Sequence, residues 1–140
     1  MKTEVLKDML YVVVGALYKV HEELGAGLNE SVYQEALEME LQSQELFYER
    51  EKEINPIYKG QKMKATFRLD FLCLWNVIVE CKAVTKLSNE HRAQLFNYMR
   101  LTKTKAGILV NFAPAFMEVE RYFFDAETNE IQTYTGEVIS

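Results

Sequence analysis

The chain has 140 residues, of which 49% are hydrophobic, and a formal charge of −5. This length suits one domain spanning 1–140 that buries roughly two thirds of its unfolded surface and folds without disulfides. The acidic balance argues against a broad phosphate-binding surface, because non-specific nucleic-acid affinity comes mainly from Lys and Arg. A local basic patch remains open, since acids dominate 22–53 but basic residues gather later, at Lys82, Lys86, Arg92, Arg100, Lys103 and Lys105.

Neither the cysteines nor the N-terminus indicates export. Cys73 and Cys81 lie in apolar runs outside any CxxC pair, which is typical of small buried hydrophobic residues in a reducing compartment. The apolar run from Met9 to Leu17 is too short for a membrane span and lacks the basic lead and cleavage site of a signal peptide. We therefore expect a cytoplasmic protein with no membrane partner.

Two helices are predicted before any strand. The first covers residues 3–24 and ends at Gly25-Ala26-Gly27. Its apolar stripe is Leu6, Met9, Leu10, Val13, Leu17, Val20 and Leu24. Asn29 is a suitable N-cap for the second, from about Glu30 to Ser43. The residues expected to face inward there are Val32, Tyr33, Ala36, Leu37 and Leu41.

A run of strands follows. Residues 45–58 are expected to be extended: the charges alternate in sign over 49–53, and Pro56 follows, as in an edge strand. Lys59-Gly60 turns the chain into a strand predicted over 62–74, which forms a hairpin with a second strand ending near residue 84. We expect both hairpin strands to be mostly buried.

The pairing register of this hairpin decides where its charges lie. A two-residue turn at Trp75-Asn76 would set Asp70 opposite Cys81 and place Glu80 on the other face. A connection made of Leu74, Trp75 and Asn76 instead sets Asp70 opposite Glu80, and opposed residues point the same way. We predict the longer connection. Lys82, two residues beyond Glu80, then shares its face.

The remaining elements complete a mixed sheet. Ser88 or Asn89 is expected to cap a helix through about Leu101. Ala106–Phe112 is a buried strand, so 76–112 forms a βαβ unit with parallel pairing. Val119–Phe124 is another strand, which ends a core covering about 3–125. Residues 126–140 form an extension that can add an edge hairpin.

Asp70, Glu80 and Lys82 suit metal-assisted phosphodiester hydrolysis. Two carboxylates bind Mg²⁺ and leave octahedral positions for water and phosphate, while an ammonium group stabilises charge on the phosphate. The alternative is an ordinary cross-strand ion pair, which this spacing alone favours.

Further motifs give a specific resemblance. Gly27, Glu30 and Tyr33 reproduce the GxxExxY signature of a family of small bacterial proteins. Asp70 followed by Glu80-Cys81-Lys82 resembles the core of the PD-(D/E)xK nuclease superfamily. The order and spacing of motifs in this chain resemble those of the GxxExxY family over about residues 10–125. Gln94 and Tyr98 resemble the QxxxY element of its RecB-like exonucleases.

This resemblance implies a fold, a set of roles and an activity. The fold is an α/β restriction-endonuclease-like αβββαβ core with a mixed central sheet and an additional N-terminal helix. Asp70, Glu80 and the backbone carbonyl of Cys81 would be metal ligands, and Lys82 the catalytic lysine. Glu30 would add a carboxylate directly or through water. Two helix residues, Gln94 and Tyr98, would position the scissile phosphate or the lysine.

The leading hypothesis is a nuclease that uses Mg²⁺, with Mn²⁺ as a substitute, to hydrolyse DNA; RNA remains open. The alternatives are a catalytically silent nuclease-like module that binds nucleic acid or a protein, and a structural subunit of a homo-oligomer. Individual residues also have structural interpretations. Glu30 can complement a helix dipole, Tyr33 can be core, Gln94 and Tyr98 can form a buried pair, His91 can cap a helix, and Trp75 can pack rather than stack on a base.

Overall fold

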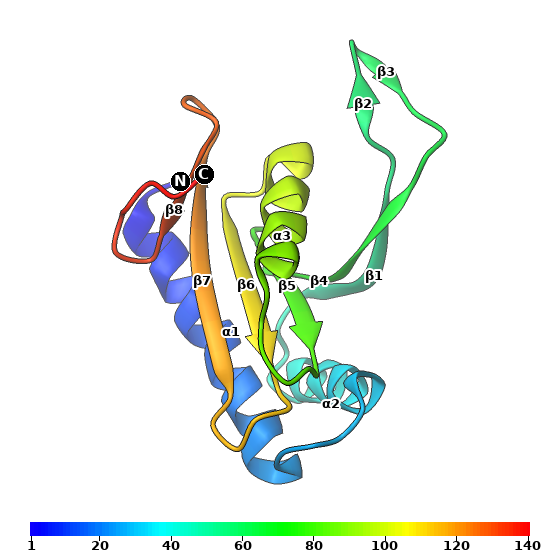
Figure 1. The fold of residues 1–140 in the computed structure, drawn as a ribbon, viewed down its shortest axis with the longest axis vertical. Helices are drawn as coiled ribbons and strands as arrows, with labels where there is room; N and C mark the ends of the chain where they lie inside the picture. The colour runs from blue at the N-terminus through cyan, green and yellow to red at the C-terminus, as the bar shows by residue number, and fades with distance from the viewer.

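The computed structural model describes all residues from 1 to 140. A six-stranded sheet has the order β1-β4-β5-β6-β7-β8, and only β5 and β6 run parallel (Figure 1). A short hairpin, β2–β3, stands apart from it. In chain order the elements are α1 (Thr3–Leu24), α2 (Glu30–Ser43), β1 (Tyr48–Ile54), β2 (Ile57–Tyr58), β3 (Gln61–Lys62), β4 (Phe67–Cys73), β5 (Val77–Lys82), α3 (Asn89–Thr102), β6 (Ala106–Asn111), β7 (Glu118–Asp125) and β8 (Glu130–Thr133).

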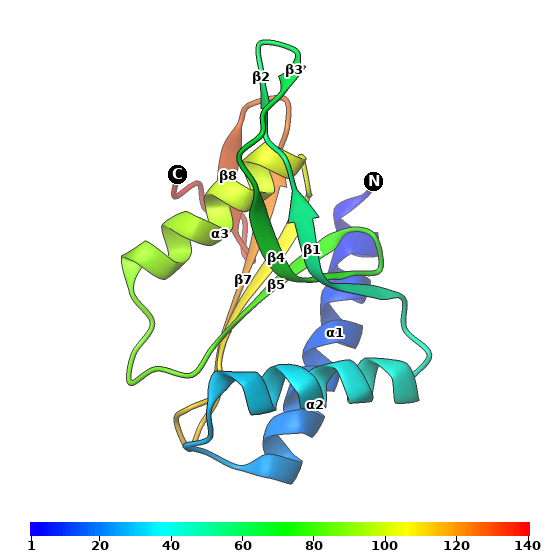
Figure 2. The ribbon, with the colours of Figure 1, turned by 90° about the vertical axis from the view of Figure 1, so that its right-hand side faces the viewer.

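The helices cover the two faces of the sheet separately. Buried residues of α1 and α2 share one hydrophobic cluster with Val79 and Ile108 of the central strands. Leu95 and Met99 of α3 pack in a second cluster with Ile78 on the opposite face. Figure 2 shows the same separation, with α3 and the α1–α2 pair on different sides of the strands. The predicted α/β class, mixed sheet and N-terminal helix are confirmed.

The predicted hairpin register is also confirmed. The pairs are Phe71 with Val79, Leu72 with Ile78, and Cys73 with Val77. The intervening Leu74 and Trp75 have φ values of 53° and 64°, the left-handed conformation that a tight type I′ hairpin turn requires. Continued by one residue, this register sets Asp70 opposite Glu80.

The alternation of side chains between the two faces of the sheet is interrupted in β4 at Asp70. Leu69 and Leu72 pack in the same α3-side cluster although they are three residues apart, while Phe71 packs on the other face. Opposite this point on β1, Glu51 has a φ of 53°. The regular alternation of a strand is therefore interrupted at the residue that carries the first carboxylate.

Most predicted boundaries match the structure, and two details differ. Val32, expected to face inward, is 41% exposed, because α2 buries the row Tyr33, Leu37 and Leu41 at four-residue spacing. The strand expected over 62–74 is divided, because Lys62 belongs to β3, residues 63–66 form no strand, and β4 begins only at Phe67. The C-terminal edge hairpin exists as β7–β8.

No helix combines the length and apolar character needed to cross a membrane.

The approach of α3 to the sheet yields a stability prediction. A Cβ added at Gly107 of β6 would lie 2.7 Å from Sδ of Met99 and 3.0 Å from Cδ1 of Leu95. Gly107→Ala should therefore lower the free energy of unfolding by about 1 kcal/mol or more. Gly15→Ala is the matched control, because Gly15 lies in α1 with open space around it and should gain about 0.5–1 kcal/mol. Urea denaturation measures both, and an unchanged or stabilised Gly107→Ala protein would contradict this close packing.

Candidate active site

The turn between α1 and α2 determines where Glu30 lies. Gly25 and Gly27 adopt left-handed conformations, with φ of 74° and 82°. The Tyr33 hydroxyl donates to the Gly25 carbonyl at 2.6 Å and accepts from the Leu28 N–H at 3.1 Å. Gly27 and Tyr33 thus build the turn, and Glu30 follows as the first residue of α2. Tyr33 is fully buried, in agreement with its core interpretation.

The same turn is tied to the ends of the central strands. The Tyr33 ring stacks on Phe112 with centroids 4.7 Å apart, and the Gly27 N–H donates to the Ala113 carbonyl at 3.1 Å. Phe112 in turn donates its N–H to the Lys82 carbonyl at 2.9 Å. The start of α2 is therefore held beside the end of β5.

Asp70 and Glu80 bind each other's strands through reciprocal hydrogen bonds. The Asp70 N–H donates to Oε2 of Glu80 at 2.8 Å, and the Cys81 N–H donates to Oδ2 of Asp70 at 2.8 Å. These bonds begin where the β4–β5 ladder ends, one residue beyond the pair of Phe71 and Val79. Each carboxylate uses one oxygen for this purpose, which leaves Oδ1 of Asp70 and Oε1 of Glu80 free for another ligand.

Burial makes this pair of acids electrostatically costly. Glu80 is only 3% exposed, and burial, followed by repulsion from Asp70, raises its pKa to about 8. Burial also raises the pKa of Asp70, although the Cys81 N–H and the Lys82 charge act in the opposite direction. Two like charges out of water favour either a proton or a cation between them. The site is therefore suited to binding positive charge.

The backbone of Cys81 faces the same gap. The N–H and C=O of one strand residue point toward the same neighbouring strand, and the Cys81 N–H points toward Asp70 on β4. The Cys81 carbonyl therefore also points toward β4, at a position beyond the last backbone pair between β4 and β5. The thiol is different: it is buried in the cluster under α1 and α2, and burial raises its pKa well above normal, so it is a poor nucleophile. Both cysteines are free and buried, as predicted.

Helix α3 brings two further predicted residues to this place. The Lys82 ammonium donates to Oε1 of Gln94 at 3.3 Å and forms no ion pair with a carboxylate. Tyr98 lies one turn further along and stacks on Phe67 of β4 with centroids 4.6 Å apart. Burial raises the pKa of Tyr98, and the charges of Glu80 and Asp70 raise it further.

The position of α3 depends on residues at both ends of its connection to β5. The Ser88 hydroxyl accepts from the His91 N–H, and Nδ1 of His91 accepts from the Ser88 N–H, which confirms His91 as a capping residue. Asn111, fully buried at the end of β6, holds Val84 by accepting from its N–H and donating to its carbonyl. We did not predict a role for Asn111; its signal is an amide closing an apolar run.

Glu30 completes the cluster from the side of α2. Burial and the Asp70 charge raise its pKa, while Lys82 acts in the opposite direction. Its Oε2 accepts from Nε2 of Gln34 at 3.0 Å, a contact that the four-residue spacing could have indicated. A hydrogen bond joins Lys82 to Gln94, and the charges of Asp70 and Glu80 affect the pKa of other members of the group. These interactions connect all six residues predicted for the site: Glu30, Asp70, Glu80, Lys82, Gln94 and Tyr98.

The available donor set fits a magnesium-like ion. No three His, Cys, Asp or Glu side chains lie close enough together to hold a metal by themselves. The free oxygens of Asp70 and Glu80 with the Cys81 carbonyl would instead provide hard oxygen ligands. Mg²⁺ is usually bound by one or two carboxylates and keeps several waters, so this set is sufficient for it.

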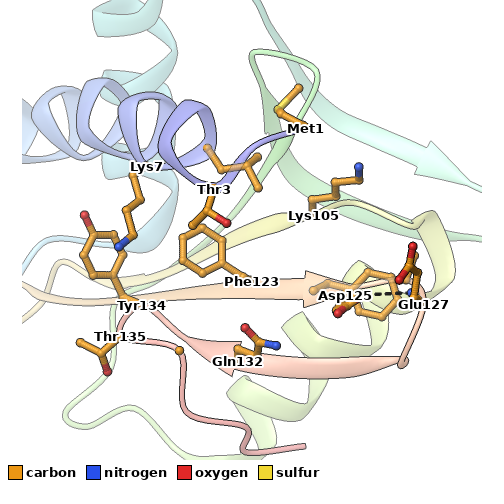
Figure 3. A pocket seen from close by; sticks show the side chains of 14 residues that line it. Met1, Thr3, Lys7, Lys105, Phe123, Asp125, Glu127, Gln132, Tyr134 and Thr135 are labelled. Atoms are coloured by element: carbon orange, nitrogen blue, oxygen red, sulfur yellow. Dashed lines mark hydrogen bonds between the residues drawn. The ribbon is translucent and has the colours of Figure 1, made fainter.

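Two cavities of the molecule lie away from these residues. One has a volume of about 660 Å³ and lies between the start of α1 and the β7–β8 hairpin. Lys7 lies over the ring of Tyr134 there (Figure 3). A second, of about 580 Å³, runs along α1 beside Tyr11 and Tyr18. Neither includes any of the six predicted site residues.

Comparison with known families agrees with this arrangement. The family model for the PD-(D/E)XK nuclease superfamily matches residues 7–122, a range that contains all six candidate residues. The chain belongs to the PD-(D/E)XK nuclease superfamily. The predicted superfamily is thereby confirmed, whereas the narrower GxxExxY assignment stays a prediction. No curated protein matches the chain.

A solved structure supports the fold of this superfamily member. The crystal structure of SSO0001 is similar with a TM-score of 0.55 and 22% sequence identity. The similarity covers 71% of this chain but 53% of SSO0001, so the chain spans about half the length of that protein. At this identity the likeness concerns the restriction-endonuclease-like fold alone.

The burial of Glu80 predicts how the metal-free protein responds to pH. Its pKa is about 8 in the folded state against 4.5 when solvated, so the folded state is penalised as pH rises through that interval. Glu80→Gln should therefore be more stable than the parent by about 1–3 kcal/mol near pH 8.5, and by much less near pH 5. Thermal unfolding in EDTA measures this difference.

The exposed Glu53→Gln variant is the control and should match the parent at both pH values. A Glu80→Gln protein that is less stable than the parent near pH 8.5, or equally stabilised at both pH values, would contradict the burial of a charged Glu80.

Proposed function

We propose that this protein is a divalent-metal-dependent nuclease that hydrolyses phosphodiester bonds of DNA, with Mg²⁺ as its metal. The observation that carries the proposal is the convergence of Asp70 and Glu80 with Lys82 where β4 and β5 separate. Nucleases of this superfamily typically use divalent metals, which agrees with the donor set.

In this proposal Asp70, Glu80 and the Cys81 carbonyl hold the metal, and Mn²⁺ substitutes for Mg²⁺. Glu30 adds its carboxylate through a water, because no three acidic side chains lie close enough together to hold one ion directly. The bound ion supplies Lewis-acid polarisation of the phosphate and lowers the pKa of an attacking water. The protein contributes the fixed ligand geometry, because the reciprocal bonds between β4 and β5 restrain both carboxylates.

Lys82 provides positive charge for the phosphate. The Lys82 ammonium group donates a hydrogen bond to the neutral amide oxygen of Gln94, so the charge is positioned without being cancelled. Such a preorganised cation stabilises the negative charge that develops on the phosphate oxygens, or orients the attacking water. Gln94 and Tyr98 would position the lysine or the scissile phosphate.

Cleavage assays test the proposal. The parent should cleave fluorescently labelled DNA in Mg²⁺ or Mn²⁺ and lose activity in EDTA. Asp70→Ala, Glu80→Ala and Lys82→Ala should each lower the rate by about 100-fold or more, because each removes a ligand or a preorganised charge. Glu53→Ala and Lys19→Ala, both exposed and outside the cluster, serve as controls. A folded parent that cleaves neither DNA nor RNA, or alanine variants as active as the parent, would refute the proposal.

Calorimetric titration with Mn²⁺ separates the roles of the three residues. Asp70→Ala and Glu80→Ala should weaken metal binding by about tenfold or more, since each removes a charged ligand. Lys82→Ala should bind Mn²⁺ at least as tightly as the parent, because a nearby positive charge is removed. A parent that binds DNA but neither Mn²⁺ nor Mg²⁺ would instead be the catalytically silent module.

A further inference from the structure

Residues 55–66, which we name the arm, project from the sheet between β1 and β4. The arm contains the β2–β3 hairpin, closed by Lys59 and Gly60 with φ of 49° and 78°. The Met63 N–H donates to the Pro56 carbonyl at 2.8 Å. Figures 1 and 2 both show this hairpin extending beyond the other elements. It is an ordered projection with its own hydrogen bonds.

The arm makes no contribution to the hydrophobic core. Neither hydrophobic cluster contains any of its residues. Ile57 is 69% exposed and Tyr58 62% exposed, and adjacent strand residues point to opposite faces. Both faces of the ribbon are thus open to a ligand.

The charge of the arm opposes that of the rest of the chain. No acidic residue occurs between Glu53 and Asp70, although the chain has 21 of them. The same stretch carries four basic residues, which are exposed and form no ion pair: Lys59, Lys62, Lys64 and Arg68. A concentrated, unpaired positive charge on an acidic protein indicates an anionic partner.

The arm is joined directly to the candidate active site. Phe67, the first residue after the arm, stacks on Tyr98, and Asp70 follows on the same strand. A ligand held along the arm and the start of β4 would therefore lie next to the carboxylates. This continuity favours the substrate of the site over an unrelated partner.

We propose that the arm seats in the major groove of duplex DNA, with its lysines on the flanking phosphates, and so holds the substrate at the active site; this rests on the proposed nuclease function. A major groove about 12 Å wide admits a two-stranded ribbon. The deep, narrow major groove of A-form RNA does not. Binding of a single strand relies on several aromatic platforms, and the arm offers only Tyr58.

Fluorescence anisotropy in EDTA tests this inference without cleavage. The probes are a fluorescein-labelled DNA duplex and the same labelled strand alone. Lys62→Glu/Lys64→Glu is compared with Lys2→Glu/Lys19→Glu, a pair of lysines in the α1 region that are also exposed and give the same change in net charge. The arm pair should weaken duplex binding by about tenfold or more and lower the slope of log affinity against log salt by about 2. The control pair should change either quantity much less.

Other results would overturn the inference. Equal weakening by both pairs would show an effect of net charge alone, and an equal loss on single strands would exclude groove seating. If the arm pair instead changed the sedimentation mass while leaving DNA affinity intact, the arm would bind a second copy of the chain. A parent that cleaves duplex DNA while the arm pair binds it normally refutes only the arm's role. A parent that neither binds nor cleaves DNA refutes the proposed function as well.

Discussion

The structure depends on the reciprocal hydrogen bonds between Asp70 and β5 and between Glu80 and β4. A buried N–H group left without a partner destabilises a fold, and strands that separate inside a sheet create such groups. Here the two carboxylates accept from the backbone N–H groups of Asp70 and Cys81, so the strands can diverge with those donors satisfied. The consequence is a gap lined by acidic oxygens, held open by the groups that would bind a metal.

The surrounding elements supply this gap with its remaining groups. The turn built by Gly27 and Tyr33 fixes the start of α2 and hence Glu30. The cap at Ser88 and the clamp of Asn111 on Val84 fix α3, which provides Gln94 for the lysine. Gly27 and Tyr33 are therefore scaffold, whereas Glu30 is part of the candidate site.

The sequence predicted those features that rest on periodicity and register. Apolar residues at successive positions indicate the buried strands, and the three-residue connection at 74–76 predicts that Asp70 lies opposite Glu80, in agreement with the observed register. Features that depend on tertiary contacts were not predictable in this way. Asn111 acts across 27 residues on Val84, and although an amide at the end of an apolar run is a local signal, nothing in it indicates which residue the amide contacts. The sequence predicts the turn at Lys59-Gly60 but extends the strands on either side of it over 45–58 and 62–74, because two-residue strands exposed on both faces leave no burial pattern.

We propose above all that the carboxylates of Asp70 and Glu80 and the backbone carbonyl of Cys81 hold one divalent cation. Anomalous diffraction from a crystal soaked in Mn²⁺ tests it most directly. We expect one strong peak in contact with carboxylate oxygens of both Asp70 and Glu80 and with the Cys81 carbonyl. A well-ordered crystal with no peak there, or with Mn²⁺ bound only at some other position, would contradict the account.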